Sequence, residues 1–401
     1  MERKNVKGLD EILKAEVERG FVTGANALVY HKNREIYYGE AGVRNLETGE
    51  PMARDTIVRL FSMSKPVTAV AVMILCERGV LSPGDPLERY LPEYAPSKLR
   101  VALPDGSFEP VRQSIRLSDL MHMTSGIPYP DSWHEPGRRM GELFDRLIGA
   151  RLSGKCVTTG DYAREIAGIP LCFQPGEGWM YGLSADLLGA VIEAATGLTY
   201  DEYLKKEIFE PLGMKDTAFA VPKEKLDRFA VAYDWGEDNV PKPFTKSALG
   251  EYYGEDVAFL SGGAGLVSTL DDYMRFARLL TGLGTLRENE AEGGSTITLL
   301  KPETVEWMRR DALLPVQRKD FLWDTMKGYG YGCLMRTLID PVAAGSPAPV
   351  GEFGWDGWMG CYMLADPGSE LAVVYQIQRA GAGTTEGAIR FRNEVYRCIN
   401  G

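Results

Sequence analysis

Apolar residues near the start of the chain recur at intervals of three and four. The pattern covers residues 7–19 and stops at Gly20, which predicts an amphipathic helix. Two strand-like runs follow, Ala25–His31 and Glu35–Gly39, separated by a short polar turn. Adjacent strands joined by a short turn favour an antiparallel hairpin. The first 40 residues therefore predict a helix followed by a hairpin.

The pattern becomes helical again at Ser62 and ends at Gly79. Between about residues 80 and 250, segments of helical periodicity alternate with loops rich in proline and glycine. The predicted helices are Leu117–Met123, Glu142–Ile148, Thr159–Ala167, Ser184–Thr196 and Tyr200–Ile208. This part of the chain is therefore expected to be mostly helical.

The last third combines helices with strand-like segments. Predicted helices cover Leu270–Leu280 and Glu386–Cys398, and predicted strands cover Tyr331–Thr337, Gly360–Ala365 and Leu371–Gln378. Strands at both ends of the chain around a helical middle indicate an α/β domain built from both termini. We expect an antiparallel sheet flanked by helices over residues 1–80 and 251–401, with residues 81–250 inserted as a mostly helical second domain.

Composition narrows the classes of partner. The 401-residue chain has a formal net charge of −11, which disfavours nucleic acid because phosphate binding needs clustered lysine and arginine. The longest apolar run, Val67–Cys76, is far shorter than the roughly 18 residues of a membrane span. No secretory leader is visible at Met1–Lys4, so we expect a soluble, cytoplasmic protein; a secreted protein whose leader has been removed would look the same. Nothing in the sequence sets an oligomeric state.

Cysteine and histidine usage also limits the possible chemistry. The six cysteines are scattered singly without a C-x-x-C pair, which is typical of reduced thiols rather than of a metal site. Of the three histidines, His31 lies in the predicted turn and His134 in a loop. We expect His122 to be a structural residue at the end of its helix. No metal or organic cofactor is implied.

The candidate chemistry begins with the sequence Phe61-Ser62-Met63-Ser64-Lys65-Pro66. Ser62 and Lys65 form an S-x-x-K pattern, and a spacing of three places both side chains on one face of a helix. A serine hydroxyl needs an adjacent base to act as a nucleophile, and a desolvated lysine can supply one. By itself the pattern is short enough to arise by chance, with Ser62 as a helix cap and Lys65 as a surface charge.

No rival nucleophile competes with Ser62. The chain contains no G-x-S-x-G, so an α/β-hydrolase elbow has no support. A Ser-His-Asp triad would have to use one of only three histidines.

With Ser62 and Lys65 placed, the chain resembles the superfamily of serine β-lactamases and penicillin-binding proteins. The likeness is greatest to its class C-like branch, which includes carboxylesterases and transesterases, and it implies the β-lactamase/transpeptidase-like fold. It covers nearly the whole chain. The supporting stretches are Met52–Val70, Leu117–Ile127, Pro175–Gly197, Phe209–Met214 and Gly262–Phe276.

The resemblance also implies roles for two further motifs. Tyr181-Gly182-Leu183 matches the family's Y-x-N, so Tyr181 is expected to share proton transfer with Lys65. Trp355-Asp356-Gly357 stands at the third motif, K-T-G or H-x-G in antibiotic-directed members. By analogy, the backbone N–H groups of Ser62 and Trp358 form the oxyanion hole.

The departures from the family pattern indicate the substrate class. Leu183 replaces the asparagine of the second motif, and Trp355 replaces the basic residue of the third. A site without these polar groups suits small uncharged esters better than anionic lactams or peptides. Trp355, Asp356, Gly357, Leu183 and the loop residue Tyr129 are candidate substrate-binding residues.

Three functions follow in order of support. The first is a serine hydrolase that works through an acyl-enzyme, either a carboxylesterase or an acyltransferase. The second keeps the fold but acts on β-lactams or D-amino-acid peptides. The third is a binding protein that kept the fold and lost the chemistry.

Overall fold

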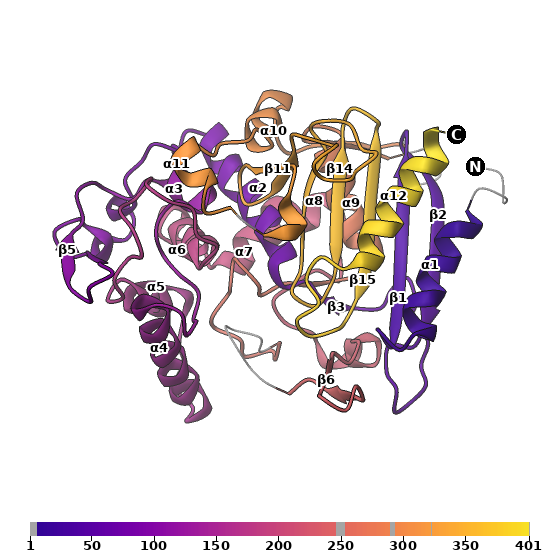
Figure 1. Ribbon diagram of the computed structural model, residues 1–401, viewed down its shortest axis with the longest axis horizontal. Coiled ribbons are helices and arrows are strands. Elements are labelled where there is room, and N and C mark those ends of the chain that lie inside the picture. Colours follow the sequence, from indigo (N-terminus) through magenta and orange to yellow (C-terminus); the bar gives the residue numbers. More distant parts are fainter. Residues whose placement is uncertain (1–5, 246–252, 289–292, 322, 401) are drawn as a thin grey trace.

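The computed structural model describes residues 6–245, 253–288, 293–321 and 323–400. A seven-stranded antiparallel sheet takes two strands from the start of the chain and five from its end, in the order β11-β12-β13-β14-β15-β1-β2 (Figure 1). The strands are β1 (Gly24–His31), β2 (Arg34–Gly42), β11 (Tyr329–Tyr331), β12 (Arg336–Leu338), β13 (Phe353–Asp356), β14 (Tyr362–Asp366) and β15 (Leu371–Ile377). The two ends of the chain meet where β1 pairs with β15, with Leu28 opposite Val374. This confirms the predicted antiparallel sheet built from both termini.

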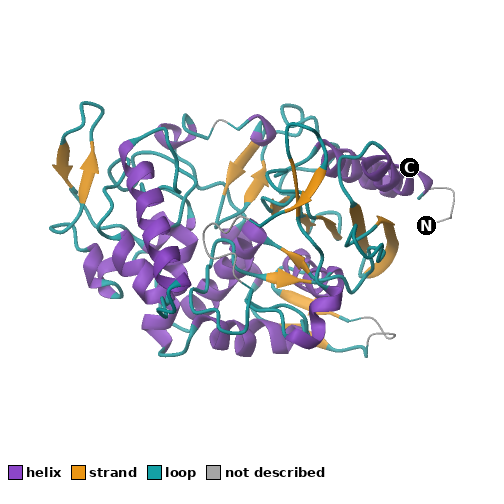
Figure 2. Cartoon of the chain, turned by 90° about the horizontal axis from the view of Figure 1, so that it is seen from below, coloured by secondary structure: helices purple, strands orange, loops and turns teal. Residues whose placement is uncertain are grey.

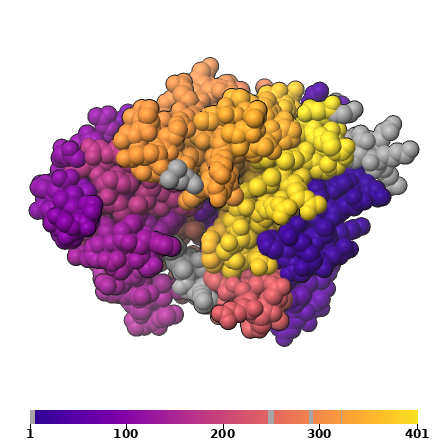
Figure 3. Space-filling model, viewed as in Figure 1, coloured from indigo at the N-terminus to yellow at the C-terminus, as the bar shows by residue number. Residues whose placement is uncertain are grey.

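Helices cover both faces of the sheet. In Figure 1, α1 (Lys7–Glu18) and α12 (Glu386–Asn400) lie in front of the sheet, and α9 (Leu270–Thr281) lies behind it against β14 and β15. Figure 3 shows the indigo and yellow terminal segments side by side, which agrees with the packing of α1 on α12. Because it is covered on both faces, β15 is buried at every residue, as a continuous apolar run requires.

The predicted helical middle lies beside the sheet. Its helices are α3 (Leu117–Met121), α4 (Glu135–Leu152), α5 (Thr159–Ile166), α6 (Ser184–Thr196), α7 (Tyr200–Leu204), a π turn (Lys205–Phe209) and α8 (Glu210–Leu212). Figure 2 shows helices gathered on the side of the molecule away from both termini, where Figure 1 labels α3, α4, α5 and α6. Helix α2 (Ser64–Glu77) packs on α6 and also contacts β13, so it lies between these helices and the sheet. The domain boundaries near residues 80 and 250 stay a prediction.

Short strand pairs and helices complete the described part of the chain. The pairs are β3 (Val58–Arg59) with β8 (Val267–Ser268), β4 (Arg100–Ala102) with β5 (Phe108–Pro110), β6 (Tyr233–Trp235) with β7 (Pro241–Pro243), and β9 (Thr285–Arg287) with β10 (Thr296–Thr298). The remaining α-helices are α10 (Pro302–Met308) and α11 (Pro315–Arg318). Among the described residues no helix is long and apolar enough to cross a membrane.

Two predicted elements were wrong in detail. The segment predicted as one strand, Tyr331–Thr337, is a hairpin in which β11 and β12 are joined by a tight turn closed by Gly332 N–H to Met335 O. Leu334 adopts a positive φ of 56° in this turn while its N–H donates to Met121 O, so a contact with α3 holds the bend. The helix expected to begin at Ser62 begins at Ser64 instead, after a 3₁₀ turn.

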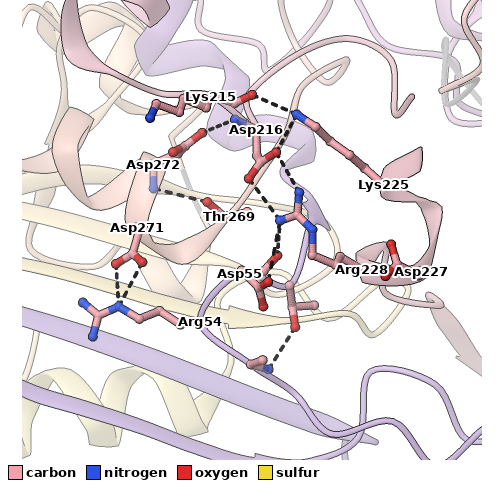
Figure 4. Close-up of polar contacts among 12 residues, drawn as sticks. Arg54, Asp55, Lys215, Asp216, Lys225, Asp227, Arg228, Thr269, Asp271 and Asp272 are labelled. Atoms are coloured by element: carbon pink, nitrogen blue, oxygen red, sulfur yellow. Dashed lines mark hydrogen bonds and ion pairs between the residues drawn. The ribbon is translucent and has the colours of Figure 1, made fainter. Parts of the chain in front are cut away.

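A network of charged residues fastens the chain beside β3 and β8, as Figure 4 shows. Arg228 pairs with Asp216 through two N–H···O contacts of 2.9 and 3.0 Å, and it donates to Asp55 O at 2.9 Å. Asp272 at the start of α9 accepts from Asp216 N at 2.6 Å. Two-point guanidinium pairing fixes orientation as well as distance. The network therefore positions the strand that leads directly into Ser62.

We expect the buried ion pair in the sheet to be important for stability. Arg336 Nη2 lies 3.3 Å from Glu352 Oε1, and both side chains are nearly inaccessible to solvent. Arg336→Met would leave Glu352 buried without this partner, which costs about 3–5 kcal/mol. Thermal unfolding measures the loss. The matched change Arg397→Met, at the exposed Arg397–Glu394 pair, should leave the melting temperature nearly unchanged; equal effects would contradict the role of burial.

Candidate active site

Ser62 lies in the middle of a 3₁₀ turn, Phe61–Met63, between β3 and α2. Phe61 has a positive φ of 48°, so the chain bends sharply just before the serine. The bend is fixed from behind, because the buried Tyr273 hydroxyl donates to Met63 O at 2.6 Å and Leu266 N–H donates to Ser64 Oγ at 3.1 Å. Ser62 itself remains partly exposed at the start of the helix.

Lys65 is completely buried below Ser62 and directed at it. Its Nζ lies 3.1 Å from Ser62 Oγ, 2.8 Å from Tyr129 Oη and 2.8 Å from Gly263 O. Burial favours the neutral amine and lowers the pKa of Lys65 to about 7, although the carboxylates of Asp186 and Asp356 act in the opposite direction. The amine is therefore close enough to Ser62, and sufficiently deprotonated at neutral pH, to accept its proton.

Tyr181 completes the group around the serine. It is hydrogen-bonded to Ser62, and its ring centroid lies 4.6 Å from Lys65 Nζ. Its Oη also accepts from Trp355 Nε1 at 3.0 Å. Burial raises the pKa of Tyr181 well above its ordinary value, so the phenol stays protonated at neutral pH. The structure thus brings together the predicted residues Ser62, Lys65, Tyr181 and Trp355, together with Tyr129.

The end of β13 approaches the serine turn closely. A Cβ on Gly357 would lie 2.2 Å from Leu60 O, so only glycine permits this approach. The ring of the next residue, Trp358, packs on Phe61 with centroids 5.3 Å apart. Across the described part of the chain, the backbone hydrogen bonds provide no acceptor for the N–H groups of Ser62 or Trp358. These two N–H groups belong to adjoining segments, the serine turn and the residue that follows Gly357.

Two carboxylates flank Lys65, that of the buried Asp186 and that of the half-buried Asp356. Asp356 was predicted from the third motif, whereas Asp186 on α6 was missed. Asp186 is a single acidic residue within a continuous buried run, Ser184–Ile192, which is the signal that identifies it in retrospect. Burial raises the pKa of both carboxyl groups, while Lys65 lowers it.

Aromatic side chains surround the tyrosine. Trp323 packs on Tyr181 with centroids 5.0 Å apart and on Trp179 at 5.4 Å, and 40% of its surface is exposed. Sequence reasoning missed Trp323 because it lies in an irregular loop distant from every motif. Trp358, which packs on Phe61 of the serine turn, is 42% exposed and also contacts Phe244. Large apolar groups left in contact with water commonly mark a ligand site.

Other candidates lie elsewhere. Leu183 is buried in the main core directly before α6, and its contact with substrate stays a prediction. His122 ends α3 and packs on Trp307, in agreement with a structural role.

The remaining polar candidates give no metal site. Cys156 is exposed, and none of the six cysteines, all of which lie within the described ranges, forms a disulfide. No group of three His, Cys, Asp or Glu side chains suited to a metal is found within the described ranges.

The sequence is similar to those of known proteins along nearly its whole length. A family model described as Beta-lactamase matches residues 9–396. The chain belongs to the β-lactamase family. Esterase EstB of Burkholderia gladioli is 32% identical over 405 residues, covering 97% of this chain and 94% of that protein. Protein Rv1367c of Mycobacterium tuberculosis is 30% identical over 385 residues, with coverage of 93% and 90%.

A solved structure gives the same answer for the fold of this β-lactamase family member. EstCE1, described as a hydrolase with promiscuous acyltransferase activity, superposes with a TM-score of 0.79. The two are 26% identical, and the match covers 100% of this chain and 99% of that one. The family resemblance and the fold predicted from the sequence are therefore confirmed.

The protonation state of Lys65 makes the reactivity of Ser62 dependent on pH. Below about pH 7 the amine becomes an ammonium ion, which has no lone pair for the serine proton. We expect the rate of Ser62 labelling by a fluorophosphonate to fall roughly tenfold per pH unit below that point and to level off above it. Intact-mass spectrometry over pH 5–9 measures this rate. A flat profile would contradict the role of a neutral amine.

Proposed function

We propose that this protein is a serine hydrolase that forms an acyl-enzyme on Ser62, acting as a carboxylesterase or acyltransferase on small uncharged esters. The observation that carries the proposal is the completely buried Lys65 amine 3.1 Å from Ser62 Oγ. A surface lysine would be charged and would leave the hydroxyl inert, whereas a desolvated amine can remove its proton. Sequence similarity to an esterase over nearly the whole chain supports the same reaction class.

In the acylation step these residues act one after another. Lys65 accepts the proton of Ser62 as Oγ attacks the ester carbonyl, and the electron pair of the carbonyl moves to its oxygen. That oxygen is held by the N–H groups of Ser62 and Trp358, which stabilise the charge as it develops. The protonated Tyr181, hydrogen-bonded to Ser62, donates a proton to the departing alkoxide and regains one from Lys65.

Deacylation reverses these roles with a second nucleophile. Water or an alcohol loses its proton to the neutral Lys65 amine and attacks the acyl-serine carbon. The bond from that carbon to Ser62 Oγ then breaks, Oγ takes a proton from Tyr181, and Tyr181 regains one from Lys65. Water gives hydrolysis, and an alcohol gives acyl transfer. The neighbour EstCE1 is described as carrying out both reactions, which favours a site open to either acceptor.

The environment of the third motif favours uncharged acyl groups. The indole N–H of Trp355 is engaged by Tyr181 Oη and provides no positive charge for a substrate carboxylate. Exposed aromatic surface from Trp323 and Trp358 lies near the serine. Apolar walls with few polar groups bind neutral acyl chains better than anionic lactams, whose charge would lose its hydration.

Replacement of the nucleophile provides the decisive test. Ser62→Ala removes the only proposed acyl acceptor, so hydrolysis of a p-nitrophenyl acetate substrate should fall by a factor of about 10⁴ or more, to the level of the uncatalysed reaction. The control Ser268→Ala changes a buried serine that bonds Thr217 away from this site, and its activity should be retained. Full activity in Ser62→Ala would refute the proposed nucleophile.

The aromatic surface predicts selectivity among acyl groups. We expect wild-type kcat/KM for p-nitrophenyl benzoate to exceed that for nitrocefin by a factor of 100 or more, on the order of 3 kcal/mol in the transition state. Trp323→Ala should lower kcat/KM for the benzoate more than for the acetate, because an aromatic contact is worth about 1 kcal/mol. Nitrocefin turnover equal to ester turnover would favour the β-lactamase alternative, and absence of labelling and turnover would favour a binding protein.

A further inference from the structure

Asp186 is a carboxylate in an environment that ordinarily excludes charge. It lies in the first turn of α6, where only 3% of the residue is exposed and the neighbouring helical positions are buried and mostly apolar. Burying an ionised carboxylate is costly unless a partner compensates it. Within the described ranges, no lysine or arginine lies within 4.0 Å of this carboxylate. The cost of burying this carboxylate must therefore be offset by an interaction other than a direct ion pair.

One oxygen of Asp186 holds the glycine-rich loop. Oδ1 accepts from Ser261 Oγ at 2.5 Å and from Gly263 N at 3.3 Å, and Ser261 Oγ in turn accepts from Ala264 N at 3.0 Å. The carbonyl of Gly263 is the acceptor that binds Lys65 Nζ. Asp186 thus fixes the loop that orients the amine.

The other oxygen faces the amine across Gly263. Oδ2 has no hydrogen-bond partner among the described residues. A Cβ on Gly263 would lie 2.7 Å from Asp186 Oδ2, 3.3 Å from Lys65 Nζ and 3.3 Å from Tyr129 Oη. The carboxylate, amine and phenol therefore converge on one point that only glycine leaves open.

We propose that Asp186 is a positioning residue that compensates the ammonium charge formed on Lys65 when Ser62 loses its proton. The inference rests on the proposed function. In the acylation step the O–H bond of Ser62 breaks and a new N–H bond forms on Lys65. The product cation is buried, and a carboxylate on the far side of Gly263 stabilises it without accepting the proton. Ser261 and the Gly263 N–H hold Oδ1 of Asp186 in place throughout this step.

The other charged groups around Lys65 do not duplicate this role. Lys65 is faced by Asp186 from α6, by Asp356 from β13 and by the neutral phenols of Tyr129 and Tyr181. The charge of Asp356 is balanced in part by Arg336, which acts to lower its pKa. On the side of Asp186, the titratable groups are Lys65 and the phenols of Tyr129, Tyr181 and Tyr200. Among the described residues, Lys65 is the cation whose charge acts on Asp186.

The experiment removes the charge and keeps the shape. Asp186→Asn retains an oxygen for Ser261 and Gly263, but it leaves the Lys65 ammonium without compensation. Two pH–rate profiles are measured, one for Ser62 labelling and one for kcat/KM with p-nitrophenyl acetate. The acidic limb of each profile, where the rate falls as the pH is lowered, should shift to lower pH by about one unit or more, because loss of an opposite charge nearby lowers the pKa of an amine. The rate at alkaline pH should also fall, since the buried cation is harder to form.

Two further variants keep the outcome clear. Asp186→Leu, of similar shape, should shift the limb in the same direction and retains a folded core if Asn is poorly tolerated. Asp272→Asn neutralises another buried carboxylate, which accepts from the Asp216 N–H (Figure 4) and from Thr217 and is not among the charges that act on Lys65. This control should alter stability without moving the limb.

Each result has a definite meaning. An unchanged acidic limb in both Asp186 variants, with labelling intact, would overturn the role of Asp186 while leaving Ser62 chemistry in place. A limb shifted to higher pH would overturn it as well. Failure of wild-type labelling, or full activity in Ser62→Ala, would instead refute the proposed function on which the role of Asp186 rests.

Discussion

The burial of one lysine amine is the constraint on which the site depends. Lys65 lies at the base of the serine turn with no exposed surface, and its hydrogen bonds go to Ser62, Tyr129 and the Gly263 carbonyl. In water a lysine is charged at neutral pH, and only desolvation makes it a base. The core around α2 therefore creates the chemistry, since the same packing that excludes water also neutralises the amine.

Four segments must meet for that environment to exist. The serine turn follows β3, the tyrosine precedes α6, the third motif ends β13, and the glycine-rich loop precedes β8. The segments meet at backbone contacts that are too close for any side chain. Gly357 lies against Leu60 O, and a Cβ on Gly182 would lie 1.9 Å from Ile127 O. Both contacts are possible because glycine has no Cβ. Such contacts allow little displacement before the hydroxyl, amine and phenol lose their alignment.

Buried charges in this protein are compensated in two different ways. In the sheet, Arg336 and Glu352 neutralise each other, and Tyr329 donates to the same carboxylate. Near the serine, Asp186 has one satisfied oxygen and one that faces the amine across a glycine. The first arrangement is complete without substrate. The second leaves an interaction that strengthens when Lys65 becomes charged, and such a gain in the transition state is what accelerates a reaction.

Local pattern was sufficient for much of this protein. The periodicity of residues 7–19, the hairpin from Ala25, and the helices at Leu270 and Glu386 follow from the spacing of apolar residues and from glycine stops, which act over a few residues. S-x-x-K brought Ser62 and Lys65 together because three residues form one helical turn. Motif order then indicated Tyr181 and Trp355.

Tertiary structure decided the rest. The bend between β11 and β12 depends on Leu334 meeting Met121, more than 200 residues away, and no local signal encodes that contact. Asp186 and Trp323 belong to the site only because α6 and a distant loop pack against the serine turn. The sequence determined which residues could do the chemistry, while burial, a property of the assembled core, determined that Lys65 could act as a base.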